Sequence, residues 1–124
     1  MTINFTSAGK DLALKNIVGR SFSSNMYVKL YVNNFSITSN TVTSDLIECT
    51  AANYSRIQLL QANWTFSNNT ASYPKIKFHI DESIIIYGYF VVQNNVLLYA
   101  EPFPEPISLD SDGGEIFIDI NISM

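Results

Sequence analysis

Hydrophobic and polar residues alternate with a period of two in three separate stretches of this chain. In residues 25–32 the aliphatic side chains occupy one parity, and two tyrosines and a lysine occupy the other. The same alternation returns in residues 75–80 and again in residues 115–123. A period of two is typical of a strand that buries one face, because successive side chains point to opposite sides of a sheet. We therefore predict three half-buried strands, whose inward side chains are Met26, Val28, Leu30 and Val32, then Ile76, Phe78 and Ile80, and finally Ile116, Ile118, Ile120 and Ile122.

A fourth stretch is hydrophobic at both parities. Residues 83–92 are mostly β-branched or aromatic, so a strand formed from them needs cover on both faces. Asn94 and Asn95 follow, and asparagine tolerates the positive φ angles of a two-residue hairpin turn. Residues 96–100 supply a second apolar run after this turn. The pattern predicts a buried hairpin in a two-layer β structure.

Shorter strands complete the predicted fold. Residues 45–50, 57–61 and 64–67 are short apolar stretches bounded by polar turn formers. Residues 110–114 are rich in Asp and Gly and supply the turn before the last strand. With about eight strands and little helix, the sequence predicts an all-β fold, an antiparallel β-sandwich or jelly roll.

Prolines mark positions where a strand cannot donate a backbone hydrogen bond. We expect Pro74 at the beginning of the strand over residues 75–80, where a missing donor is tolerated. Pro102, Pro104 and Pro106 form an extended segment that cannot join a central ladder. This segment is predicted to follow a sheet edge or to cross the top of the sandwich.

The N-terminal residues 1–24 have a different pattern. Ser7 can cap a helix, helix-forming residues follow it, and Gly19 can end it. We predict a short helix or a docking arm here, followed by a single β-sandwich domain at residues 25–124. A chain of 124 residues can form one core without covalent staples, since folding at this size hides about two thirds of its surface.

Charge is scarce and unevenly distributed. Residues 1–77 carry all seven lysines and arginines against three acidic residues, a balance of +4. Residues 78–124 carry eight acidic residues and no lysine or arginine, a balance of −8. Opposite potentials can steer copies of a chain to stack, but strands from both halves that mix within the fold would cancel the difference, and we favour the mixing. The net charge of −4 without a basic cluster predicts no binding of nucleic acid.

The chain offers no address for export or membrane insertion that we can identify. Its start lacks the basic and apolar segments of a signal peptide. Its longest apolar run is far shorter than the roughly 20 residues of a transmembrane span. The single Cys49 cannot form an internal disulfide and is expected to be a small buried side chain. We expect a protein without a membrane partner.

Residues for catalysis are few. The only histidine, His79, shares a strand face with Lys75 and Lys77 and is expected to be exposed. Residues 110–115 have the acid spacing of a fragment of a calcium loop, but the rest of the twelve-residue pattern is missing. The chain also lacks a Gly-rich phosphate loop and the Cys and His spacings of metal sites. We predict no enzymatic activity, no metal and no cofactor.

Five motifs span most of the chain from Lys10 onward and read LYVNN at 30–34, ANWT at 62–65, YGYFVV at 87–92, LYAEPF at 98–103 and GGEI at 113–116. Together these motifs resemble a group of small proteins of tailed bacteriophages. Where that group commonly has a basic residue after Ala-Glu, this chain has Pro102, so a contact made by that basic residue does not carry over. Where the group has Gly-Asp before the last strand, this chain has Gly113-Gly114-Glu115.

The resemblance implies a virion structural protein that decorates or cements the capsid in many copies. Its partners would be the major capsid protein and further copies of itself, in a homo-oligomeric lattice where weak contacts add through multivalency. It would be made in the host cytoplasm and reside in the virion. A tail, neck or fibre component is the first alternative.

Aromatic side chains on the predicted strands are the candidate contacts. Exposed tyrosines commonly mark an interface, whereas a covered second face of the sheet explains them equally well. A third alternative is a carbohydrate-binding β-sandwich module, in which Trp64 and Tyr89 would be exposed platforms. The predicted partner interface comprises Lys10, Lys15, Tyr27, Tyr31, Trp64, Tyr87, Tyr89 and Phe103.

Overall fold

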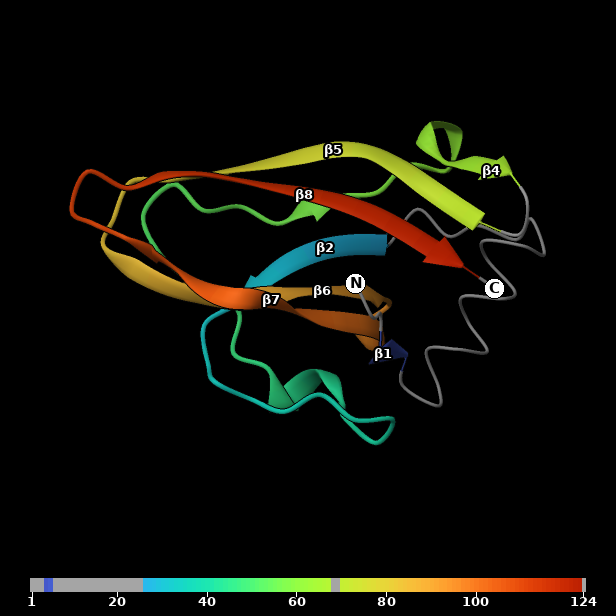
Figure 1. The fold of residues 1–124 in the computed structure, drawn as a ribbon, viewed down its shortest axis with the longest axis horizontal. Helices are drawn as coiled ribbons and strands as arrows, with labels where there is room; N and C mark the ends of the chain where they lie inside the picture. Colours follow the sequence, from blue (N-terminus) through green and yellow to red (C-terminus); the bar gives the residue numbers. More distant parts are fainter. Residues whose placement is uncertain (1–3, 6–25, 68–69, 124) are drawn as a thin grey trace.

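The strands form two antiparallel sheets, in the orders β1-β7-β6-β2-β3 and β4-β5-β8 (Figure 1). The computed structural model describes residues 4–5, 26–67 and 70–123, so the all-β prediction is confirmed for this part of the chain. The predicted arm or helix at residues 1–24 lies outside the described residues apart from β1, and so do Lys10 and Lys15. The elements are β1 (Asn4–Phe5), β2 (Met26–Tyr31), the 3-10 helix η2 (Thr43–Asp45), β3 (Ile57–Gln58), the 3-10 helix η3 (Gln61–Asn63), β4 (Thr65–Ser67), β5 (Thr70–Ile80), β6 (Ile84–Gln93), β7 (Val96–Leu109) and β8 (Gly114–Ser123).

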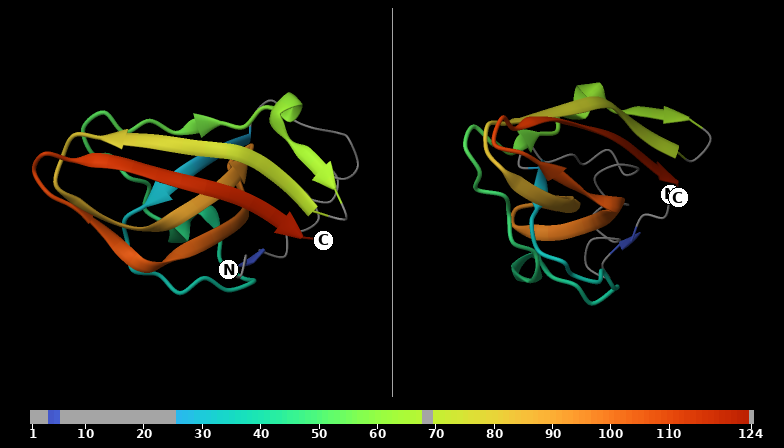
Figure 2. Two further views of the ribbon diagram at one scale, coloured as in Figure 1. Left: turned by 45° about the horizontal axis from the view of Figure 1, so that its top comes forward. Right: turned by 60° about the vertical axis from the view of Figure 1, so that its left-hand side comes forward.

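Strands β5 to β8 form a two-stranded ribbon that folds back on itself. β5 pairs with β8, and β6 pairs with β7, so the pairs are nested along the chain. The register places Ile80 opposite Gly114 and Ile84 opposite Leu109. The turns at residues 81–83 and 110–113 therefore lie at the same end of the molecule, where the ribbon passes from one sheet to the other. Figure 2 shows the two halves of the ribbon in separate layers.

The main hydrophobic core lies between the two sheets. β5 and β8 contribute the inward isoleucines and phenylalanine that the alternation predicts, and β2 contributes aliphatic side chains from the facing sheet. Removing this apolar surface from water is the dominant force that holds the layers together. The predicted inward positions are confirmed for Met26, Val28, Leu30, Ile76, Phe78, Ile80, Ile116, Ile118 and Ile120, which are all buried.

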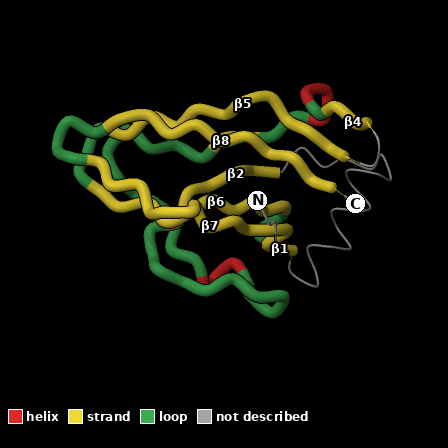
Figure 3. Tube along the Cα trace, in the orientation of Figure 1, coloured by secondary structure: helices red, strands yellow, loops and turns green. Residues whose placement is uncertain are grey.

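The second face of the larger sheet is covered as well. The chain between β2 and β3 forms a long loop with η2, which lies against this sheet in Figure 3. Leu46 from the loop packs with Phe90 and Val92 of β6 in a separate apolar cluster. Central strand β6 is thus covered on both faces, as its unbroken hydrophobic run predicts. Tyr31 belongs to this cluster. Of the two explanations for the tyrosines, an exposed interface or a covered second face of the sheet, the second is therefore correct for Tyr31.

Four of the predicted strands are absent or have other bounds in the structure. Residues 45–50 do not form a strand. The helix η2 ends at Asp45, and of the residues that follow, Glu48 makes only an isolated bridge to Tyr31. The strands predicted at 57–61 and 64–67 are shortened to β3 and β4. β5 begins four residues before Pro74, which instead lies where the β5–β8 register shifts. A bulge accommodates the missing N–H donor inside the strand.

The proline segment lies in β7 but interrupts its pairing with β6. Pro102 is opposite Gly88, and the next paired residue of β7 is Ile107, opposite Ile86. The register shift between these pairs leaves residues 103–106 without a partner in the ladder. β1 pairs with β7 only at Tyr99 and Ala100, so this half of β7 is at the sheet edge, as predicted.

Charges from the two halves of the chain meet on the outer face of the smaller sheet. Nζ of Lys77 lies 3.0 Å from Oε2 of Glu115, and Nζ of Lys75 lies 3.9 Å from Oδ2 of Asp119. The predicted mixing of the acidic and basic halves is therefore confirmed for this face. Exposed pairs of this kind contribute little to stability.

The predicted hairpin turn between β6 and β7 is confirmed. Asn94 and Asn95 have φ angles of 51° and 64°. Gln93 pairs with Val96 across the turn. Two consecutive positive φ angles in a two-residue loop are typical of the turn that suits the right-handed twist of a hairpin.

Replacing Asn95 with Ala is expected to lower the free energy of unfolding by about 1 kcal/mol, because a Cβ without a compensating polar group disfavours the left-handed region. Asn95→Gly is the matched control and is expected to cause no loss, since glycine adopts positive φ freely. Urea unfolding of both variants measures the difference. Equal stability of the two variants would contradict the role of the backbone angle.

Candidate functional site

A surface pocket lies at the tip of the β6–β7 hairpin. A pocket of about 240 Å³ opens there, and its walls come from β2, β6, the hairpin turn and the residue before β3. We call this feature the hairpin-tip surface; its lining residues are Tyr27, Arg56, Val92, Asn94 and Asn95. The sheet register explains the assembly, because Tyr27 of β2 is opposite Val92 of β6 and opposite Gln58 of β3.

Arg56 stacks on the ring of Tyr27. Its guanidinium carbon lies 3.9 Å from the ring centroid. Arg56 is exposed and Tyr27 is half-buried, so the guanidinium covers the ring on the solvent side. A guanidinium held flat against an aromatic ring keeps its N–H groups free at the edge, where they can bind a carboxylate with two hydrogen bonds. No ion pair to Arg56 is present within the described part of the chain.

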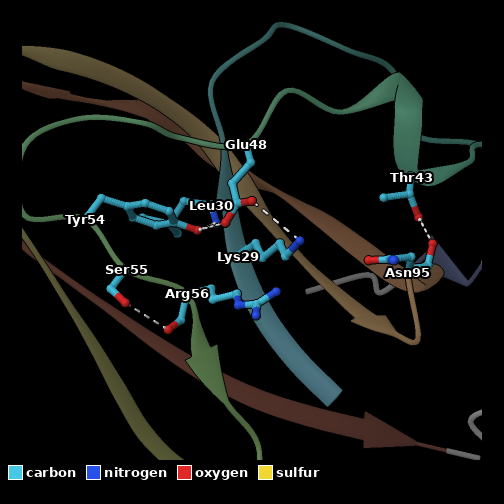
Figure 4. Close-up of polar contacts among 8 residues, drawn as sticks. All are labelled: Lys29, Leu30, Thr43, Glu48, Tyr54, Ser55, Arg56 and Asn95. Carbon is cyan, nitrogen blue, oxygen red and sulfur yellow. Dashed lines mark hydrogen bonds and ion pairs between the residues drawn. The ribbon is translucent and has the colours of Figure 1, made fainter. Parts of the chain in front are cut away.

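The nearest basic side chain is already neutralised. Nζ of Lys29 lies 3.4 Å from Oε1 of Glu48, and the hydroxyl of Tyr54 donates to Oε2 of the same carboxylate at 2.8 Å (Figure 4). The backbone N–H of Leu30 donates to the Tyr54 hydroxyl. Burial raises the pKa of Tyr54, so its hydroxyl stays protonated and able to donate. Glu48 is therefore engaged by Lys29 and Tyr54 rather than by Arg56.

The hairpin tip is fixed by the loop that covers the sheet. Oγ1 of Thr43 in η2 donates to the backbone carbonyl of Asn95 at 2.9 Å (Figure 4). Asp45 at the end of η2 accepts from the backbone N–H of Val42 at 3.0 Å. Val42 precedes Thr43 and Val96 follows Asn95, and both valines are exposed. The pocket thus lies beside anchored backbone that also presents exposed apolar side chains.

Three residues of the predicted partner interface are not on the surface. Tyr31 is 0% exposed, Tyr89 is 2% exposed and Trp64 is 7% exposed. The expectation that they form exposed contacts is therefore wrong for this structure. The loop of residues 32–50 and the facing sheet cover them, and the local pattern of residues does not show which segments supply this cover.

The remaining predicted contacts are scattered. Tyr27 lies in the hairpin-tip surface, Tyr87 packs against the apolar cluster beneath the covering loop, and Phe103 packs against the main core. All three are half-buried. The structure therefore brings Tyr27, but not Tyr87 or Phe103, into the site.

Sequence reasoning missed Arg56 and treated Asn94 and Asn95 only as a turn. Arg56 is an isolated basic residue between Ser55 and Ile57, and its neighbour Tyr27 is 29 positions away along the chain. Only the pairing of β2 with β3 brings them together. The one available signal was that Arg56 is the single basic residue between Lys29 and Lys75.

A buried polar cluster lies away from the surface, in the interior of the larger sheet. Glu101 of β7 is 1% exposed, and its Oε2 accepts from the hydroxyl of Tyr89 at 2.7 Å. Oε1 of Glu101 and the hydroxyl of Tyr31 have no hydrogen-bond partner. Burial raises the pKa of the Glu101 carboxyl above its ordinary value, and the Tyr89 hydroxyl opposes this shift. Because Glu101, Tyr31 and Tyr89 are all buried, we treat the cluster as a structural feature.

The chemistry-bearing residues singled out from sequence lie as expected. His79 is exposed, and its Nε2 lies 2.7 Å from Oδ1 of Asp81. Cys49 is buried, and burial raises the pKa of its thiol. Among the residues that the structure describes, no group of three or more His, Cys, Asp or Glu side chains could hold a metal ion. None of the helices in these ranges is long and apolar enough to cross a membrane.

Comparison with known proteins finds no family model and no curated protein that matches this chain.

Proposed function

We propose that this chain is a non-enzymatic structural protein of a tailed-phage particle, which decorates the capsid by binding the major capsid protein and copies of itself. The motifs that resemble small phage proteins support the particle assignment. The nested ribbon of β5 to β8 supports a sandwich of the jelly-roll kind, because a ribbon folded across two facing sheets is the basic element of that topology. In this proposal the protein acts through its outer surface.

The observation that carries the proposal is the stacked pair of Arg56 and Tyr27 at an anchored hairpin tip. Arginine and tyrosine are enriched at the centres of protein interfaces, where a few side chains supply most of the binding energy. The exposed Val42 and Val96 beside the anchor add apolar surface of the kind that interfaces bury. A rigid tip with these side chains can bind a protein without paying to order a loop.

A tail, neck or fibre component remains the alternative within the particle, since the same surface could serve there. The carbohydrate-binding alternative is weakened, because Trp64 and Tyr89, its expected platforms, are both buried. Copy number separates the two particle assignments.

The test is to count the chain in purified particles by quantitative mass spectrometry and to add purified protein to particles that lack it. We expect a copy number comparable with that of the major capsid protein and saturable rebinding. Arg56→Ala should reduce occupancy by about tenfold at limiting concentration, as for an interface hot spot. Lys75→Ala, on the outer face of the smaller sheet, is the matched control. Absence from the particles, or a copy number typical of tail parts, would overturn the capsid assignment.

A further inference from the structure

The two ends of the folded ribbon carry unlike charge. The hairpin-tip surface contains Arg56 at one end, and the turns at residues 81–83 and 110–113 form the other end (Figure 1). β6 runs between these ends over ten residues, which corresponds to about 30 Å. The ion pairs between β5 and β8 neutralise charge on the outer face of the smaller sheet, but they leave the two ends of the ribbon with unlike charge.

The acidic end carries four exposed carboxylates, Asp81, Glu82, Asp110 and Asp112. Asp81 is engaged by His79 and by the side-chain amide of Asn53. Glu82 accepts from the backbone N–H of Ala52 at 2.7 Å, so it caps the neighbouring loop. These contacts hold the turn at residues 81–83 in place.

The turn at residues 110–113 presents its carboxylates to solvent. Oδ1 of Asp110 accepts from the backbone N–H of Asp112, and the backbone N–H of Gly113 donates to the Asp110 carbonyl, both at 2.9 Å. Gly113 has a φ of 72°, which tightens the turn. The carboxylate of Asp112 makes no ion pair within the described ranges and is exposed at the apex.

We propose that the pocket at the hairpin-tip surface of one copy receives the Asp112 carboxylate of a second copy, so that copies join head to tail. Arg56 supplies the paired N–H donors, and its stacking on Tyr27 fixes their direction. The side-chain amides of Asn94 and Asn95 line the same pocket and provide polar walls for the incoming turn. Asp45 of η2 lies in the loop that anchors the hairpin, and its Oδ2 accepts a hydrogen bond from the backbone N–H of Val42.

The contact is heterologous, because the donor and acceptor surfaces differ. Such contacts generate rings when the rotation closes and filaments when it does not. The inference deepens the proposed function and rests on it, since it assigns the hairpin-tip surface to the contact between copies, through which Arg56 raises occupancy of the particle. A single partly exposed ion pair is weak, so association should be modest in solution and add up only in a lattice.

A charge-swap mixing experiment tests the proposal. Arg56→Glu removes the guanidinium from the pocket and keeps the acidic turn, whereas Asp112→Lys removes the carboxylate from the turn and keeps the guanidinium. Each variant alone should associate about tenfold more weakly than the wild type. Mixed together, the two should recover association as alternating copies, because at both contacts each variant then meets an opposite charge on the other. The double variant, with both charges reversed, should recover association.

Sedimentation velocity over a concentration series provides the measurement. Raising the ionic strength from about 0.01 M to about 1 M should weaken the wild-type association, because it shortens the screening length from about 30 Å to about 3 Å. Lys75→Glu makes the same change of net charge on the outer face of the smaller sheet and should leave association unchanged. Thermal unfolding confirms that each variant is folded. A monomeric wild type at all concentrations, or a mixture that stays monomeric, would overturn the proposal.

The capsid experiment separates this inference from the proposed function. Asp112→Lys should still bind particles at a concentration where isolated copies attach, although it no longer self-associates. Self-association without any particle binding would leave the head-to-tail contact standing and refute the capsid role.

Discussion

Replacing Gly88 with Ala is expected to lower the free energy of unfolding by about 3 kcal/mol, at the upper end for overpacking of a core. A Cβ on Gly88 would lie 2.3 Å from the backbone carbonyl oxygen of Glu101 and 2.5 Å from the hydroxyl oxygen of Tyr31. Both distances are far below van der Waals contact. The carbonyl belongs to the paired backbone of β7, so it cannot move without disturbing the ladder.

The position of Gly88 explains why this close approach exists. Gly88 lies opposite Tyr31 of β2 and opposite Pro102 of β7, next to the register shift in β7. The Tyr31 ring fills the space above the glycine, in the manner of an aromatic residue that covers a glycine on the neighbouring strand. The Tyr31 side chain and the register shift in β7 therefore leave room only for glycine at position 88.

Urea unfolding measures the loss, and Gly114→Ala is the matched control. A Cβ on Gly114 would lie 3.1 Å from Cδ2 of Leu109, the end of a flexible side chain, so its cost should be well below that of Gly88→Ala. The double variant Gly88→Ala with Tyr31→Phe should recover only part of the loss, because the carbonyl clash remains. Equal costs for Gly88→Ala and Gly114→Ala would show that the close approach is absent in solution.

Tyr89→Phe is the second large change and is expected to cost about 2 kcal/mol at pH 7, as for a hydrogen bond to a charged group. It removes the hydroxyl that donates to Oε2 of Glu101. Since Oε1 has no partner, both oxygens of a buried carboxylate would then lack a donor. Tyr31→Phe is the matched control, because the Tyr31 hydroxyl makes no hydrogen bond and its removal should be close to neutral.

The sign of the pH dependence follows from the pKa of Glu101. Burial raises this pKa in the folded state, so the folded protein takes up the proton more readily than the unfolded chain. The contribution of Glu101 to stability is therefore fully present below the unfolded pKa and is lost as pH rises through the folded pKa. The cost of Tyr89→Phe should accordingly shrink on acidification, because a protonated carboxyl depends less on its donor.

Glu101→Gln isolates this titration from that of the other acidic residues. The free energy of unfolding of Glu101→Gln relative to the wild type should be higher at pH 7 than at pH 4.5, whatever the constant offset between the two proteins. Denaturant unfolding at a series of pH values measures the difference. A difference that does not change with pH would mean that Glu101 is solvated rather than buried. The hydroxyl of Tyr31 does not titrate in this range, since burial and the charge of Glu101 raise its pKa to about 12.

Several features of the fold could be predicted because they depend on residues close together in the chain. Strands β2, β5 and β8 follow from the alternation of apolar residues, which records a single buried face. The hairpin turn follows from Asn94 and Asn95, which tolerate the positive φ angles that a two-residue loop requires. The irregular course of Pro102 to Pro106 follows from the missing N–H donors.

The errors have a common physical cause. Residues 45–50 were predicted as a strand from local composition, but Leu46 packs into the cluster under the sheet and draws the chain into a covering loop. Tyr31, Tyr89 and Trp64 were predicted as exposed contacts because an alternating strand does not reveal what covers its second face. Their burial depends on segments that arrive from elsewhere in the chain.

The sequence by itself determined the strands, their inward faces and the central turn, since each depends on short-range periodicity and on backbone angles of single residues. The tertiary structure alone decided which segments cover the two faces of the larger sheet, that Glu101 is buried beside Tyr89, and that Arg56 stacks on Tyr27. These features need strand register and long-range packing to bring distant residues together. Local sequence patterns carry no record of either.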